Sequence, residues 1–266
     1  MMRMLAAEFF KLKRSRMTLW SGLIVLVAAA LSLAVLPVLA DPKIQADIAK
    51  SGGAFAKAVA DGMYDASWTN YLRVGVQGMT GSWGILSFGL VTAYLFGREF
   101  KEGASTAMLT LPIRREYLVV AKLVVLAVWV FALGLLSVAL NAVATAILGV
   151  PGFSWAAVLK SMTEITAAIA PLYLTLPLVA WLAVRSRGYL QPMLYSLGVM
   201  MVGNALVQTS MSRYFPWNMP LHMFGASWYP VPPSPLVPGS WAVAGAVFVV
   251  GVAALVWQID HVESAG

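Results

Sequence analysis

Six runs of apolar residues constrain the fold of this chain more than any other feature. Hydrophobic residues make up 60% of its 266 residues, far more than a soluble fold of this size carries. The hydrocarbon core of a membrane offers no water, so a chain that crosses it must satisfy its own backbone hydrogen bonds, and runs of about 20 apolar residues do so as helices. The sequence therefore predicts an all-α, polytopic membrane protein with one transmembrane domain over 1–266. The predicted spans are residues 19–40, 82–96, 118–148, 165–184, 191–207 and 241–258.

The lengths of these runs are unequal. The second is short for a span and the third is long, so a broken or kinked helix is compatible with both. Two prolines within the fourth run, Pro171 and Pro177, predict a kink there.

Basic residues predict how the chain is oriented. Cytoplasmic loops carry an excess of Lys and Arg, and an amino terminus in the cytoplasm places twelve of the 18 basic residues inside. We therefore expect a multi-pass protein of the inner (cytoplasmic) membrane with both termini in the cytoplasm. The net charge of +7 is explained by membrane orientation, and nucleic-acid binding is not expected. The inside residues are Arg3, Lys11, Lys13, Arg14, Arg16, Arg98, Lys101, Arg114, Arg115, Lys122, Arg185 and Arg187.

Residues 2–17, ahead of the first span, alternate apolar and basic side chains at helical spacing. This pattern predicts an interfacial amphipathic helix that contacts membrane lipids, with Phe9, Lys11, Lys13 and Arg14 as its characteristic residues. A charged flank that only fixes topology is the alternative. The basic residues and the apolar run also resemble a signal peptide, but the run exceeds the usual apolar length of about 7–15 residues, so we expect it to be retained as a span.

Two longer segments are expected outside the cytoplasm. Residues 41–81 predict a loop with one or two small helices, part of which lies against the membrane surface or a partner protomer. Residues 209–240 combine aromatic residues with many prolines, which excludes one straight helix and favours a re-entrant or interfacial element. That element either anchors the chain at the headgroups or gates the exit of a substrate.

The sequence offers little support for chemistry within the chain. It has no Walker-type phosphate loop, no cysteine and two histidines that are too far apart for a metal motif, so we expect no catalytic residue, no metal and no cofactor. Gly225-Ala226-Ser227 resembles an intramembrane serine-protease motif, but a suitable histidine partner is missing. A possible polar path consists of Asn141, Glu164, Tyr173 and Asn204; these side chains either line a route or bridge helices, and Glu164 either relays protons or faces headgroups.

Residues 97–117, between the second and third spans, are densely charged in a chain with only 11% charged residues. Acidic residues at the start of a helix and basic residues near its end suit the helix dipole and offer charged contacts to a partner. The segment is therefore predicted to dock into another protein on the cytoplasmic side.

These motifs resemble a known family. The order E-x-x-E-G-x-x-T, then L-P-x-R-R-E-Y and the lysine of the next run, together with the amino-terminal E-F-x-K-x-x-R-S-R, is similar to permease subunits of type-2 ATP-binding-cassette exporters. The resemblance implies that residues 97–117 form a coupling helix that sits in a cleft of a separate ATPase subunit. The coupling residues that it implies are Glu99, Phe100, Lys101, Glu102, Gly103, Thr106, Arg114 and Arg115.

The resemblance also implies a function. Two permease copies, or a permease and a paralogue, would pair with ATPase subunits that bind ATP and magnesium, and the spans would export a substrate by alternating access without catalysing a reaction themselves. Bacterial drug, bacteriocin and lantibiotic-resistance permeases are similar in size, which suggests an antimicrobial peptide, a drug or a lipid-like molecule as the substrate. A self-contained secondary transporter or a membrane scaffold is the alternative, although the ionisable midplane residues and paired halves of the former are not evident.

Overall fold

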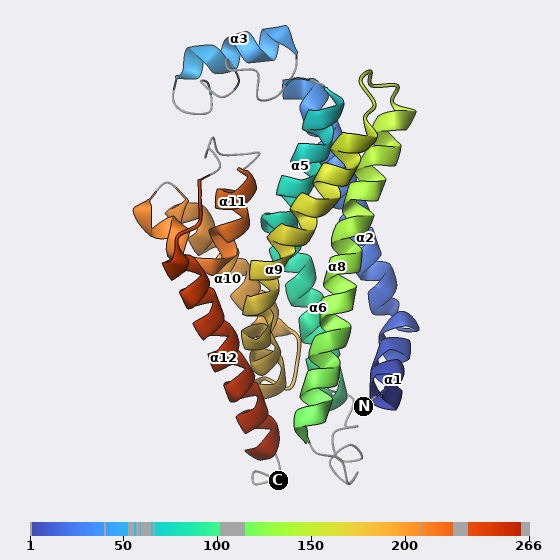
Figure 1. The fold of residues 1–266 in the computed structure, drawn as a ribbon, viewed down its shortest axis with the longest axis vertical. Coiled ribbons are helices and arrows are strands. Elements are labelled where there is room, and N and C mark those ends of the chain that lie inside the picture. Colours follow the sequence, from blue (N-terminus) through green and yellow to red (C-terminus); the bar gives the residue numbers. More distant parts are fainter. Residues whose placement is uncertain are drawn as a thin grey trace.

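A computed structural model describes residues 2–39, 41–52, 56, 59, 65, 67–101, 115–207, 209–225 and 234–261. These residues form an all-α bundle, with no strand among them (Figure 1). The α-helices are α1 (Met2–Lys13), α2 (Arg16–Leu39), α3 (Pro42–Ser51), α5 (Trp68–Thr80), α6 (Ser82–Lys101), α8 (Arg115–Ile147), α9 (Trp155–Arg185), α10 (Leu190–Leu206), α11 (Met219–Phe224) and α12 (Pro238–His261), and the short 3-10 helices are η1 (Ser210–Tyr214) and η2 (Pro216–Asn218).

Four of these helices are long and apolar enough to cross a membrane. They comprise Arg16–Val38, Glu116–Ile147, Trp155–Arg185 and Pro238–His261, and α5 with α6 makes a fifth if that bent pair counts as one span. The remaining predicted span, 191–207, corresponds to α10, a helix of 17 residues. The chain is thus an all-α, multi-pass membrane protein.

The short second span has a structural explanation. Helix α5 precedes α6 in the chain, and the two are joined by a bend of 44° at Gly81. Tight packing at the bend requires glycine at position 84, because a Cβ atom there would lie 1.8 Å from the carbonyl oxygen of Met79. The predicted loop 41–81 therefore differs from the structure in its second half, where α5 packs in the bundle and buries Trp68 and Tyr71. Polar residues and glycines interrupt the apolar run in α5, so hydropathy alone did not extend the span.

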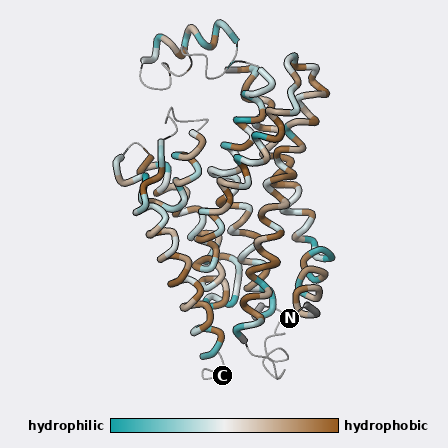
Figure 2. Tube along the Cα trace, in the orientation of Figure 1, coloured by the Kyte–Doolittle hydropathy of each residue, from teal (hydrophilic) through white to brown (hydrophobic). Residues whose placement is uncertain are grey.

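Helix α1 lies at the same end of the bundle as the carboxyl end of α12 (Figure 1). A short turn separates α1 from α2, and the hydroxyls of Ser15 and Thr18 both donate to the carbonyl of Leu12, at 2.6 and 2.8 Å. Side-chain donors thereby satisfy the carbonyl end of α1. Helix α3 lies at the opposite end of the molecule and buries none of its residues (Figure 1). Figure 2 shows the contrast in hydropathy between the mainly hydrophobic α8 and the more hydrophilic α3.

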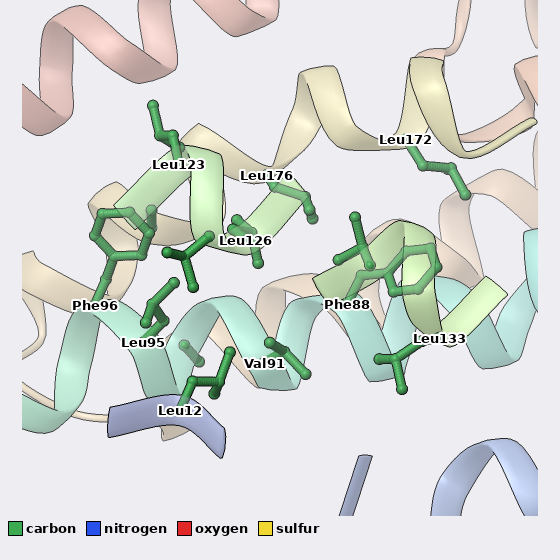
Figure 3. Packing of buried hydrophobic residues seen from close by; sticks show 14 of the residues in the cluster. Leu12, Phe88, Val91, Leu95, Phe96, Leu123, Leu126, Leu133, Leu172 and Leu176 are labelled. Atoms are coloured by element: carbon green, nitrogen blue, oxygen red, sulfur yellow. The ribbon is translucent and has the colours of Figure 1, made fainter. Parts of the chain in front are cut away.

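The hydrophobic core runs along α6, α8 and α9. Leu12 of α1 joins it at one end, near Leu95 and Phe96 of α6, and Leu133 of α8 lies further along with Phe88 (Figure 3). Helix α9 remains one continuous helix through Pro171 and Pro177 and packs against most of the other long helices. The hydrophobic core thus packs α1 against the spans at the end of the bundle where α12 also ends.

Helices α9 and α12 approach very closely at the second of these prolines. A Cβ atom on Gly251 of α12 would lie 2.7 Å from the backbone nitrogen of Leu178 and 3.0 Å from the carbonyl carbon of Pro177. A Cβ atom on Gly245, six residues earlier on α12, would meet no atom within 4 Å. Close backbone approach at small residues is a common way to pack helices in membranes.

Replacing Gly251 with alanine should therefore separate α12 from α9. We expect Gly251→Ala to lower the thermal stability of the purified protein in detergent, at a cost of about 1–3 kcal/mol in unfolding free energy. Gly245→Ala is the matched control and should leave stability unchanged or raised, because alanine favours a helix more than glycine does. Equal melting temperatures for the two variants would contradict this packing.

Candidate functional site

A network of four charged side chains joins α1, α6 and α8. The Lys122 ammonium lies 2.8 Å from Glu8 Oε2 and 3.0 Å from Glu99 Oε2, while Lys11 Nζ lies 2.7 Å from Glu8 Oε1 and 3.2 Å from Glu99 Oε1. Each carboxylate therefore bridges both ammonium groups. We call these residues the four-charge cluster; its charges sum to zero.

The centre of the four-charge cluster is buried. Glu8 is 4% exposed and Lys122 is 3% exposed. Lys122 also donates a hydrogen bond of 3.0 Å to the backbone carbonyl of Leu95 in α6. An isolated charge at such a position would be strongly disfavoured, but here the ammonium has three oxygen acceptors. Removing one member would leave buried charge without its partner.

The amphipathic pattern of α1 explains how Glu8 comes to lie inside. Glu8 and Leu12 are four residues apart, and therefore share one face of the helix, and both are buried. Leu12 enters the hydrophobic core and carries Glu8 toward Lys122, while Lys13 on another face stays exposed. Burial of the apolar face and pairing of the charges thus fix α1 against the bundle together.

Both α1 members of the four-charge cluster are held in their charged forms. Burial on its own would raise the pKa of Glu8, but the charge of Lys122 and the hydrogen bonds from Lys11 and Lys122 outweigh it and hold the pKa below its ordinary value of 4.5. Burial would likewise lower the pKa of Lys11, but Glu8 and Glu99 raise it above 10.5. The Glu8 contribution is lost as pH falls through its depressed pKa, and the Lys11 contribution as pH rises through its raised pKa, so both are present at neutral pH.

The four-charge cluster lies where the chain enters and leaves the predicted coupling segment. Glu99 is in the last turn of α6 and Lys122 lies two turns into α8. The predicted coupling residues Phe100 and Lys101 end α6 and Arg115 begins α8, but their side chains lie outside the described residues, as do Glu102, Gly103, Thr106 and Arg114 altogether. The structure thus describes both arms of the segment.

The residues predicted for the interfacial helix lie on α1 or in the turn that follows it. Phe9 packs against the core and meets the Trp129 ring edge-on, with centroids 6.3 Å apart. Lys11 belongs to the four-charge cluster, whereas Lys13 and Arg14 are exposed. The helix therefore contacts the bundle through one face and presents basic residues on another.

The residues of the possible polar path are not brought to one place. Asn204 lines a cavity of about 210 Å³ at the bend between α5 and α6, with Gln77 and Asn218 also in its wall. Glu164 Oε1 lies 3.8 Å from Nζ of Lys160 in the preceding turn of α9. The hydroxyl of Tyr173 donates to the carbonyl of Leu123, which bridges α9 to α8. The Tyr173 hydrogen bond thus links two helices, whereas the Glu164–Lys160 pair lies within α9.

Asn141 is almost fully buried at a close contact of α8 with α5. Its amide nitrogen donates to the carbonyl of Ser137, and a Cβ atom on Gly75 would lie 2.6 Å from the Asn141 amide. The amide oxygen of Asn141 has no hydrogen-bond partner among the described residues. The side chain fills a gap between the two helices.

His222 of α11 forms hydrogen bonds with two serine hydroxyls, away from the four-charge cluster. Its ring nitrogens lie 3.1 Å from Ser234 Oγ and 2.9 Å from Ser212 Oγ. Burial, together with the charge of Arg213, lowers the pKa of His222. Of the Gly225-Ala226-Ser227 motif, Ala226 and Ser227 lie outside the described residues. Within the part of the chain that the structure describes, no group of three His, Cys, Asp or Glu residues could hold a metal ion.

A comparison with protein families decides the class of the protein. The model of the ABC-2 family of transporter proteins matches residues 4–203, a stretch that contains the whole four-charge cluster. This chain belongs to the ABC-2 family. An ABC-2 permease is a membrane subunit of an ATP-binding-cassette transporter, in agreement with the resemblance seen in the coupling motifs.

A curated relative is similar to most of this ABC-2 permease. It is the bacitracin transport permease protein BCRB of Bacillus licheniformis, which is 26% identical over 180 residues, covering 68% of this chain and 85% of the relative. No solved structure matches the chain. The chain is therefore a multi-pass ABC-2 permease that resembles antibiotic-resistance permeases.

Sequence reasoning missed the pairing of Glu8 with Lys122 in this ABC-2 permease. Glu8 is the one acidic residue in an otherwise basic amphipathic helix, and Lys122 lies inside an apolar run. An acidic residue in a basic helix and a basic residue in an apolar run are both unusual, and their opposite charges favour a pair. Their separation of 114 residues hides the contact from any local pattern.

Removing the Lys122 ammonium should undock α1. In Lys122→Met the carboxylates of Glu8 and Glu99 retain only Lys11, so we expect a loss of about 3–5 kcal/mol in stability and faster proteolysis of α1. Lys13→Met, at an exposed position of α1, should change neither the stability of the protein nor the rate of proteolysis of α1.

The double variant Glu8→Gln with Lys122→Met tests whether the two groups act on each other. Its loss should be smaller than the sum of the two single losses, because each single change already breaks the same pair. Melting temperatures in detergent provide the measurement, and strictly additive losses would rule out the coupling.

Proposed function

We propose that this ABC-2 permease couples a separate ATPase subunit to its spans through residues 97–117, and that the four-charge cluster transmits the movement. The observation that carries the proposal is that one cluster holds both arms of the segment, at Glu99 on α6 and Lys122 on α8, together with α1. A force applied to the segment would reach three helices through these contacts at once.

The proposed orientation places the four-charge cluster at the cytoplasmic end of the bundle. Residues on α1, at the end of α6 and at the start of α8 supply most of the basic residues assigned to the inside, and the carboxyl end of α12 lies at the same end of the bundle (Figure 1). The positive-inside rule assigns such an end to the cytoplasm, here that of the inner membrane. ATP and magnesium would be bound by the ATPase subunit there, since the chain has no phosphate-binding motif and needs no cofactor of its own.

In the proposed cycle the permease performs no chemistry. Closure of the ATPase pair on ATP would push residues 97–117, and the movement would pass along α6 to the bend at Gly81 and along α8 into the core. A bend between two helices is a place where rigid segments rotate relative to each other. Glu99 thus acts as an anchor for the segment, while Glu102, Gly103, Thr106 and Arg114 are the proposed contacts with the ATPase.

The proposed substrate is an antimicrobial peptide, a drug or a lipid-like molecule. The similarity to a bacitracin transport permease supports this class. The substrate path would lie between this chain and a second copy or a paralogue. Exposed apolar side chains along α2, including Leu19, Leu23 and Leu26, leave a surface for lipid or for that second permease.

Single cysteines test the orientation directly, because the chain contains none. We introduce cysteine in place of Lys13 on α1 or Lys50 on α3, both of which are exposed. A membrane-impermeant maleimide should label Lys50→Cys in intact cells, and Lys13→Cys only after the membrane is permeabilised. The reverse pattern would overturn the orientation.

Charge reversal within the segment tests coupling. The ATPase subunit should co-purify with the wild-type permease, and Glu102→Arg combined with Arg114→Glu should reduce drug or peptide export by tenfold or more while membrane insertion persists. Lys50→Glu, at the opposite end of the bundle, is the control and should export normally. Unchanged export by the double variant would remove the coupling assignment, and export without any ATPase subunit would favour a self-contained transporter.

A further inference from the structure

A basic groove between α1 and α6 is not used by the proposed coupling mechanism. It has a volume of about 360 Å³ and lies beside the four-charge cluster. Three cationic side chains line it: Lys11, Arg14 and Arg98. The hydroxyl-bearing residues Ser15 and Tyr94 also line it. Arg14 and Arg98 supply guanidinium donors, and no carboxylate is among the described residues of the lining, which suits an anion.

Two of the three cations, Arg14 and Arg98, are not members of the four-charge cluster. Lys11 already pairs with Glu8 and Glu99, and the four charges of that cluster cancel. Arg14 adds positive charge beyond this balance and makes no ion pair with any described residue. The Arg98 guanidinium lies 5.6 Å from the centroid of the Tyr94 ring, which orients it along the α6 wall of the groove.

The groove lies level with the beginning of a membrane span. Ser15 lines it, and the apolar span of α2 starts at the next residue, Arg16. Just beyond, Leu19 and Trp20 are exposed, as expected of side chains that meet acyl chains and the interface. Phe10, in the groove itself, is 55% exposed. A ligand here would have a polar group among cations and an apolar part close to the hydrocarbon.

We propose that the α1–α6 groove binds the phosphate of an anionic phospholipid headgroup. Guanidinium groups bind phosphate oxygens through paired hydrogen bonds, and basic pockets at the cytoplasmic ends of membrane helices are suited to such headgroups. Arg14 would approach the phosphate from the α1 side and Arg98 from the α6 side, so the lipid links the two elements. The proposal requires neither the ATPase subunit nor a transported substrate.

Reconstitution in nanodiscs of defined lipid tests the proposal. Wild-type permease should melt at a higher temperature in phosphatidylglycerol than in phosphatidylcholine and should retain phosphatidylglycerol in native mass spectrometry. Arg14→Gln with Arg98→Gln should weaken phosphatidylglycerol retention about tenfold, in keeping with the loss of charged hydrogen bonds. The matched control, Lys13→Gln with Arg16→Gln, removes equal charge from the same end outside the groove and should retain the lipid.

The remaining measurements make each outcome decisive. If both double variants lose phosphatidylglycerol to the same extent, the lipid is attracted by surface charge in general, and the proposed binding site is wrong. If inorganic phosphate added to phosphatidylcholine nanodiscs stabilises the wild type as much as phosphatidylglycerol does, the ligand is a free anion and the lipid proposal fails. Arg14→Gln alone changes an exposed residue, so it keeps the test valid if the double variant does not fold, and its retention of lipid at the wild-type level would count against the proposal.

Discussion

The ammonium group of Lys122 imposes a condition that several helices must meet together. It is buried two turns into an apolar span, where an uncompensated charge would be costly. Glu8 can reach it only if α1 packs on the bundle, and Glu99 can reach it only if α6 extends to that level. The need to compensate this one buried charge therefore fixes α1, the end of α6 and the start of α8 relative to one another.

A buried ion pair of this kind specifies an arrangement more than it adds stability. Well-packed apolar residues often stabilise a core as much as buried charges do, whereas charges tolerate few alternative positions. In this permease the arrangement that they specify lies at the base of residues 97–117. A segment fixed at both arms can transmit displacement, whereas a segment attached to fraying helix ends would absorb it.

The class of fold could be predicted from the sequence because apolar length is a local property. The runs that became α2, α8, α9 and α12 each contain enough apolar residues to cross a membrane, and no tertiary contact is needed to see this. Hydropathy did not identify α5 as part of a span, because Asn70, Arg73 and Gln77 interrupt its apolar character, although most of its residues, including Gln77, are buried. Its place in the bundle depends on the bend at Gly81, which hydropathy does not encode.

The candidate site was only partly predictable, for a related reason. Charge density drew attention to Glu99 as a contact with a partner protein, and in the structure its carboxylate pairs with Lys11 and Lys122 of the same chain. Pairing over 88 or 114 residues is a tertiary property. The family resemblance, carried by short motifs on either side of the span, agreed with the family match over residues 4–203.

The length of α8 has a consequence for how deep the protein sits in a bilayer. From Lys122 to Ile147 the helix rises about 38 Å, against a hydrocarbon thickness of about 30 Å. The excess is about one and a half turns, and in a bilayer of that thickness it would place the connection between α8 and α9 at the level of the far headgroups. Phe153 and Trp155 are exposed there and stack edge to face, forming an aromatic anchor opposite the charged end. Membrane thickness would then determine how far the α8–α9 connection extends beyond the bilayer. The length of the lipid acyl chains would therefore change the depth at which the permease sits.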